Sequence, residues 1–298
     1  MRIETNIEPP GTLNLFLSSV IVAGWMGGQI IASSISGWTL VAFGVAFSFL
    51  TLPLYSLMHE CEHNIFHKNK WINDIAGTIL SAFFPGPFSF LRGCHLGHHR
   101  RNRTEAEMFE IIQPGDSAWK KTGFFYFMYL GGFWLSVPVS MIPLLLWPAL
   151  LKSRMIQNTV SASAMVNGVP RHFYLRIRLE CVFVLVVHLA LIWSLNLNPS
   201  TYLLILVAGG INWSSQQYIQ HAGSPLDVIH GAHNLKASRP YQKWILNFNW
   251  HLAHHQHPQV PWNMLPKFHD PSRDRPPYLV SFLKFWKGPR RLEIRRDA

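Results

Sequence analysis

The sequence predicts an all-α integral membrane protein with about four transmembrane helices arranged as two hairpins. Three observations support this fold class. Hydrophobic residues make up 49% of the 298 residues and charged residues only 14%, whereas a typical soluble domain carries about 25% charged residues. The hydrophobic residues form runs of the length needed to cross a bilayer, about 20 residues. Basic residues lie between these runs and give the chain a net charge of +11.

The first predicted hairpin consists of the apolar runs Leu13 to Ile35 and Trp38 to Met58, joined by the turn Ser36-Gly37. The second run continues directly into His59. Two further runs, residues 179–197 and 200–218, are joined by a tight turn and form the second predicted hairpin. The first histidine cluster is therefore expected where the chain leaves the membrane.

Two other apolar segments contain helix breakers. Residues 71–91 are interrupted by Pro85-Gly86-Pro87, which predicts a re-entrant or interfacial helix instead of a span. Residues 124–151 contain Gly131-Gly132 and two prolines. This segment fits either one tilted span or a bent hairpin that returns to its starting side, which is tolerated when broken backbone is buried in protein.

The positions of the basic residues favour the hairpin for residues 124–151. All Lys and Arg except Arg2 lie in residues 59–122, 152–178 and 221–298, and none lies in the turns 35–37 and 196–199. A returning hairpin puts these three segments on one side, which the positive-inside rule makes the cytoplasmic side. They form a discontinuous cap within a single domain over residues 1–298. This distribution argues against nucleic-acid binding as the reason for the positive charge.

Sixteen histidines are the most informative feature of the sequence. Half of them lie in three clusters: His59 and His63; His95, His98 and His99; and His251, His254 and His255. On a helix, residues three or four apart lie on one face, so their imidazoles can approach one metal ion. Eight cluster histidines exceed the needs of one ion and therefore predict two. His221, just after the last apolar run, is a ninth candidate ligand. The three cysteines show no paired spacing and predict no disulfide framework.

At these residues the chain resembles the membrane fatty acid desaturase superfamily, whose three histidine boxes read HxxxH or HxxxxH, HxxHH, and HxxHH or QxxHH. The resemblance covers about residues 38–268 and includes the segment from Asn249 to Pro266. It implies two non-haem Fe ions held by the nine histidines, with O₂ as co-substrate. It supports His221 as a ligand. It also places Gln217 where relatives have an Asn near the metals, and implies that Gln217 and Asn249 lie just outside the ligands.

The resemblance also implies a lipid acyl substrate and an external electron donor, such as ferredoxin or cytochrome b5 with its reductase. The chain has neither a cytochrome b5 module nor cysteines spaced for an iron–sulfur cluster. The N-terminus lacks a cleavable signal pattern, so a multi-pass protein of a bacterial inner membrane is the default location. Desaturation is the favoured reaction, and hydroxylation or ketone formation by the same class of centre is the alternative.

Two further functions compete with this interpretation. The segment from His59 to His63 also matches HExxH, the zinc protease motif in which Glu60 would act as the general base. A metal transporter or sensor is the other alternative. Six carboxylates could orient imidazoles from outside, although for each one alone a solvated surface position is the favoured interpretation: Glu60, Glu62, Glu105, Glu107, Asp227 and Asp270. Four arginines flank the second box and could bind a lipid phosphate or simply anchor the chain at the membrane: Arg92, Arg100, Arg101 and Arg103.

Overall fold

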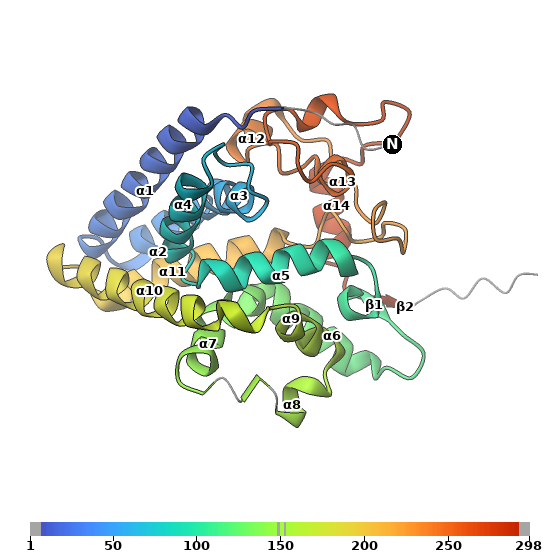
Figure 1. Ribbon diagram of the computed structural model, residues 1–298, viewed down its shortest axis with the longest axis horizontal. Helices are drawn as coiled ribbons and strands as arrows, with labels where there is room; N and C mark the ends of the chain where they lie inside the picture. Colours follow the sequence, from blue (N-terminus) through green and yellow to red (C-terminus); the bar gives the residue numbers. More distant parts are fainter. Residues whose placement is uncertain (1–6, 148–149, 152, 292–298) are drawn as a thin grey trace, which may run out of the picture.

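The computed structural model describes residues 7–147, 150–151 and 153–291, so Arg2 and the end of the predicted cap lie outside the described residues. Helices dominate these residues (Figure 1). The strands β1 (Ile111–Ile112) and β2 (Arg290–Arg291) form one short parallel pair. The predicted all-α class is therefore confirmed.

The first predicted hairpin is present. Helix α1 spans Gly11–Ser33, and α2 (Gly37–Ser48) continues into α3 (Thr51–Glu62). Gly37 opens α2 with a φ of +58°, a conformation that glycine adopts without steric cost. Both α1 and the joined course Gly37–Glu62 are long and apolar enough to cross a membrane.

The segment predicted to be broken by Pro85-Gly86-Pro87 forms two helices. Helices α4 (Lys70–Phe83) and α5 (Phe88–Arg101) meet at an angle of 98°. Helix α4 exposes Trp71, Ile75 and Ile79 at four-residue spacing, which is the pattern of a helix with one face towards lipid. Helix α5 continues beyond the predicted end and carries the whole second histidine box.

Residues 118–145 form one bent helical course. It comprises α6 (Ala118–Phe127), the π-helical turn η2 (Met128–Gly132) and α7 (Phe133–Leu145). The bend lies at Leu130 and at Gly131, which has a φ of +128°. The glycine pair thus breaks the helix as the sequence predicts. By length and composition the whole course also qualifies as a membrane span, whereas the sequence favoured a returning hairpin.

The second predicted hairpin is formed by α10 (Tyr174–Ser194) and α11 (Pro199–Gln216), which follow the short helices α8 (Arg154–Gln157), α9 (Val160–Asn167) and η4 (Arg171–Phe173). Its tip lies beside the tip of the first hairpin, because the Asn198 backbone N–H donates to Ser33 Oγ over 3.1 Å. Trp38 and Trp193, near the two tips, are each 87% exposed.

Helices α10 and α11 are not among those that qualify as spans by length and composition. Arg176, Arg178 and Glu180 lie in the first turns of α10, and the last turns of α11 are rich in Asn, Ser and Gln. The described structure therefore has three candidate spans, or four if α4 and α5 are counted as one broken span.

The remaining elements surround the C-terminal ends of α3 and α5 (Figure 1). They are η1 (Glu105–Glu107), α12 (Arg239–Trp244), α13 (His251–Gln256), η5 (Leu265–Lys267) and α14 (Tyr278–Phe285). We call this region the cap. Segments distant in the sequence meet here, and they bring the histidines together.

Candidate metal centre

All nine histidines singled out in the sequence converge at the junction between the helices and the cap. They divide into two groups, and within each group one potential ligand atom per histidine lies within 4.8 Å of all the others. The five-histidine group contains His59, His63, His95, His99 and His254. The four-histidine group contains His98, His221, His251 and His255. The sequence predicted the number of sites but not this division.

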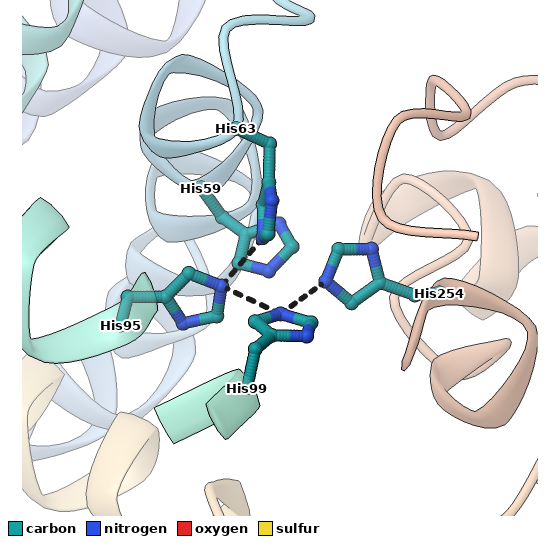
Figure 2. A group of neighbouring side chains, drawn as sticks. All are labelled: His59, His63, His95, His99 and His254. Carbon is teal, nitrogen blue, oxygen red and sulfur yellow. Dashed lines mark hydrogen bonds between the residues drawn. The ribbon is translucent and has the colours of Figure 1, made fainter. Parts of the chain in front are cut away.

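The five-histidine group joins three elements (Figure 2). His59 lies on α3 and His63 caps that helix, while His95 and His99 lie on α5 and His254 on α13. The Nε2 atom of His95 lies 2.6 Å from the Nε2 atom of His63 and 3.2 Å from that of His99. His99 Nε2 lies 3.0 Å from His254 Nε2. Ring nitrogens from the three elements therefore face one point.

The four-histidine group has the same character. His251 Nε2 lies 3.0 Å from His221 Nε2 and 3.3 Å from His255 Nε2. The ring of His98 stands edge-on to both His221 and His255, with centroids 4.9 and 5.1 Å away. His221 lies in the turn that follows α11, so this group draws on three elements: α5, α13 and the turn.

Both groups fit a transition metal. An imidazole nitrogen binds a divalent metal such as zinc at about 2.0–2.1 Å, so neighbouring ligands on one ion have nitrogens roughly 3 Å apart. Metal binding needs neutral imidazoles. Burial, reinforced by the neighbouring histidines, lowers the pKa of His221, His251, His254 and His255 well below the ordinary value. These side chains are therefore kept neutral and available as ligands.

Helical spacing explains the division. In the second box His95 and His99, four residues apart, share the five-histidine group, and in the third box His251 and His255, also four apart, share the four-histidine group. The third member of each box belongs to the other group. Each of these two boxes contributes ligands to both groups and joins them.

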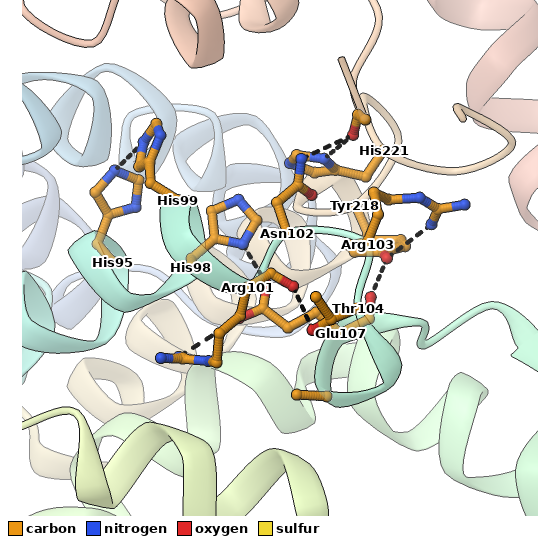
Figure 3. Close-up of polar contacts among 12 residues, drawn as sticks. His95, His98, His99, Arg101, Asn102, Arg103, Thr104, Glu107, Tyr218 and His221 are labelled. Atoms are coloured by element: carbon orange, nitrogen blue, oxygen red, sulfur yellow. Dashed lines mark hydrogen bonds and ion pairs between the residues drawn. The ribbon is translucent and has the colours of Figure 1, made fainter. Parts of the chain in front are cut away.

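Of the six carboxylates proposed as outer partners, Glu107 contacts an imidazole closely: its Oε2 accepts a hydrogen bond from Nδ1 of His98 (Figure 3). Glu62 Oε2 lies 3.9 Å from His95 Nδ1. Glu60 accepts from the Trp262 backbone N–H, Glu105 is exposed, and Asp227 and Asp270 bond residues of their own turns. None of these last four carboxylates has a hydrogen bond to any of the nine imidazoles among the described residues.

The four arginines behave differently from one another. Arg103 is fully buried and donates to Glu110 Oε1 over 2.7 Å, to Tyr218 OH and to the Ser224 carbonyl. It therefore supports the turn that carries His221 and binds no lipid. Arg92 pairs with Asp74, and Arg100 is exposed. Sequence reasoning missed the support role of Arg103 and Tyr218, because Arg103 lies more than 100 residues from both Tyr218 and Ser224.

Gln217 and Asn249, the two polar residues expected just outside the ligands, have different surroundings. Gln217 lines a cavity together with His98, His221 and His251. Asn249 is buried and donates to the Leu235 carbonyl over 2.7 Å and to Gln242 Oε1 over 3.2 Å. It therefore holds the segment before the third box in place without contacting an imidazole among the described residues.

The cavity has a volume of about 180 Å³ and is bordered by both groups, through His95 of one and His98, His221 and His251 of the other. Leu91, Cys94, His98 and Arg101 also line it. Their spacing places them on one face of α5 over about 15 Å of helix. Most of the remaining wall is apolar or aromatic, with Tyr55, Phe84, Phe109, Phe133, Trp213 and Phe248. Exposed Ser136 and Met165 stand at its edge.

Comparison with known proteins identifies the family. The fatty acid desaturase family matches residues 36–286. This chain belongs to the fatty acid desaturase family. It is 33% identical to a Delta(12) fatty acid dehydrogenase from Crepis alpina over 81 residues, 27% of this chain and 21% of the relative. It is 31% identical to sn-1 oleoyl-lipid 12-desaturases from Arthrospira platensis over 98 residues (32% and 26%) and from Anabaena variabilis over 110 residues (36% and 31%). The matches thus span about a third or less of each relative.

Family membership and geometry together argue against the zinc protease. A protease would use His59 and His63 with one further ligand and would point Glu60 at the substrate. In the structure these two histidines stand with three others. Glu60 is buried on the Trp262 backbone N–H and does not line the 180 Å³ cavity.

Proposed function

We propose that this protein is an O₂-dependent di-iron membrane desaturase that introduces a double bond into a lipid acyl chain. The observation that carries the proposal is the convergence of nine histidines into two metal-sized groups, both of which border one largely apolar cavity through His95, His98, His221 and His251. The names of the partial relatives support a lipid acyl chain as the substrate.

Iron suits this ligand set, because neutral imidazole binds iron as well as zinc and copper. Two iron ions in the groups would supply the activation of O₂, and an external donor such as a ferredoxin or cytochrome b5 would supply two electrons per turnover. The net reaction removes two hydrogens from adjacent methylenes and, with these electrons and two protons, reduces O₂ to water.

The chain's own residues position the substrate. The aromatic side chains of the cavity wall would hold an extended acyl chain along α5, past His95 and His98. Exclusion of water from such a wall strengthens the electrostatic interactions of the imidazoles and protects reactive species from side reactions. Ser136 and Met165, at the exposed edge, would mark the point where the chain enters from the bilayer.

The membrane topology follows from the convergence of the boxes. Because His99 and His254 meet, the chain must cross the membrane an even number of times between the second and third boxes. The contact between Asn198 and Ser33 supports α10 and α11 as two crossings that parallel the first hairpin. Residues 118–145 then return at the Leu130–Gly131 bend. All basic segments lie on the side of the boxes in this topology, which the positive-inside rule assigns to the cytoplasm. A bacterial inner membrane remains the default location.

Lipid profiling tests this function. Cells that express the protein should contain acyl chains that have lost two hydrogens, and cells that express His251→Ala should not. Acyl chains that gain an oxygen atom would instead assign the protein to the hydroxylases or ketolases. An unchanged lipid profile in cells supplied with iron and an electron donor would refute both.

A further inference from the structure

The two histidine groups differ in what holds their imidazoles. In the four-histidine group the ring nitrogens that face away from the centre have firm partners at two positions: His98 Nδ1 donates to Glu107, and His221 Nδ1 donates to the Gly231 carbonyl over 2.8 Å. In the five-histidine group the nearest such partner among the described residues is Glu62, 3.9 Å from His95 Nδ1. Two imidazoles of the four-histidine group are thus oriented by hydrogen bonds from outside the group, and one of these bonds goes to a carboxylate.

Glu107 is itself held firmly. It lies at the end of η1 and is buried. Two of the three carbonyls of this short helix accept side-chain hydrogen bonds: Ala106 from Ser161 Oγ over 2.5 Å, and Glu107 from the Tyr218 hydroxyl. Arg101 Nη2 lies 3.5 Å from the free carboxylate oxygen. The backbone and side chain of Glu107 are therefore both fixed before a metal binds (Figure 3).

This arrangement has a chemical consequence for His98. A carboxylate that accepts the Nδ1 proton leaves the Nε2 lone pair facing the metal, fixes the ring orientation and raises the basicity of the ligand. His98 is also one helical turn from His95, which serves the other group. Glu107 therefore acts on one site of a centre whose two sites share α5.

From this geometry we infer that Glu107 is a positioning residue specific to the four-histidine site: through His98 it sets that site's metal affinity and leaves the five-histidine site unaffected. The inference rests on the proposed metal centre. Removal of a group that hydrogen-bonds to a metal ligand typically lowers metal affinity about 10–100-fold. Here the lower affinity is expected for only one of the two ions.

Cobalt(II) titration of the full-length metal-free protein in detergent, followed by visible absorption and by chelator competition, tests the inference. The wild type should bind two ions. Glu107→Ala should weaken one of them about 10–100-fold, and Glu107→Gln, which keeps the hydrogen bond but loses the charge, should fall between. Glu105→Ala is the matched control, because Glu105 is exposed on the same short helix. It should bind both ions as the wild type does.

A double variant separates positioning from general damage. If Glu107 acts through His98, adding Glu107→Ala to His98→Ala should cause no further loss of affinity. Equal weakening of both ions by Glu107→Ala, or a full further loss on top of His98→Ala, would overturn the inference. A wild-type protein that binds no cobalt would instead overturn the metal centre itself. Matching thermal unfolding of the metal-free single variants would show that the chain still folds.

Discussion

The five-histidine and four-histidine groups are held by different kinds of contact. Around the five-histidine group several supports are hydrogen bonds between neutral groups. Asn73 Nδ2 donates to the Cys61 carbonyl within the first box, and Asn14 bridges the Phe66 carbonyl and Trp262 Nε1. Around the four-histidine group they are charged, with the Arg103–Glu110 ion pair beneath the His221 turn and Glu107 on His98.

The difference follows from where the ligands come from. The five-histidine group takes four of its members from α3 and α5, so helical geometry already orders most of it. The four-histidine group includes His221, which lies in a turn without helical order. Such a turn needs strong tertiary contacts to be held in place, and buried ionic hydrogen bonds provide them.

The largest expected effect is that of removing a ligand. His251→Ala and His254→Ala should each abolish the lipid product, because both groups border the cavity proposed to hold the acyl chain. Their metal content should differ: His251→Ala leaves three histidines and should lose one ion, whereas His254→Ala leaves four and should retain more metal. Mass spectrometry of lipids and metal analysis of the purified protein check this.

His257→Ala is the matched control for these ligand variants, since His257 follows the third box but belongs to neither group. It should retain product and metal. Undiminished product in either ligand variant would show that the reaction does not need both groups.

The second expected effect concerns the supports. Arg103→Leu leaves Glu110 buried without its ion-pair partner, a change that typically costs about 3–5 kcal/mol. Asn14→Ala removes neutral hydrogen bonds and should cost about 1–3 kcal/mol. Thermal unfolding in detergent measures both. Arg100→Leu, at an exposed position, is the control and should leave stability nearly unchanged. A larger loss of stability in Asn14→Ala than in Arg103→Leu would contradict the view that the charged supports contribute more than the neutral ones.

A smaller effect is expected from pH. In the folded protein burial lowers the pKa of His221, His251, His254 and His255, whereas in the unfolded chain it is about 6.5. The unfolded chain binds more protons as the pH approaches this value, so the metal-free protein should lose stability as the pH falls from 7.5 to 6.5.

Unfolding midpoints measured with a chelator present test this dependence. His255→Gln should reduce the slope, while His172→Gln, at an exposed position, should not. A stability that rises on acidification would contradict the burial of neutral imidazoles in both groups.

The smallest effect is expected at the cavity edge, away from both groups. Ser136→Trp should partly block the cavity and reduce product formation without changing metal content. Ser140→Trp, one turn further along α7 and outside the cavity lining, is the control. Equal amounts of lipid product from the wild type and Ser136→Trp would show that the acyl chain does not enter past Ser136.

Much of the fold could be predicted from local patterns. The apolar runs gave the helices of both hairpins, and Pro85-Gly86-Pro87 and Gly131-Gly132 gave the breaks at the correct residues. The outer partners could not be predicted in this way. Glu105 and Glu107 are two residues apart and chemically equivalent, and only the direction in which η1 faces α5 separates an exposed carboxylate from one bonded to His98.

The sequence by itself determined the nine histidines and the helices that carry most of them. Tertiary structure decided how these histidines divide between the two metal-binding groups. Adjacent residues on a helix point roughly 100° apart, so His98 and His99 face different groups, as do His254 and His255. That division exists only once α3, α5, α13 and the His221 turn meet, because each group takes ligands from at least three of these elements.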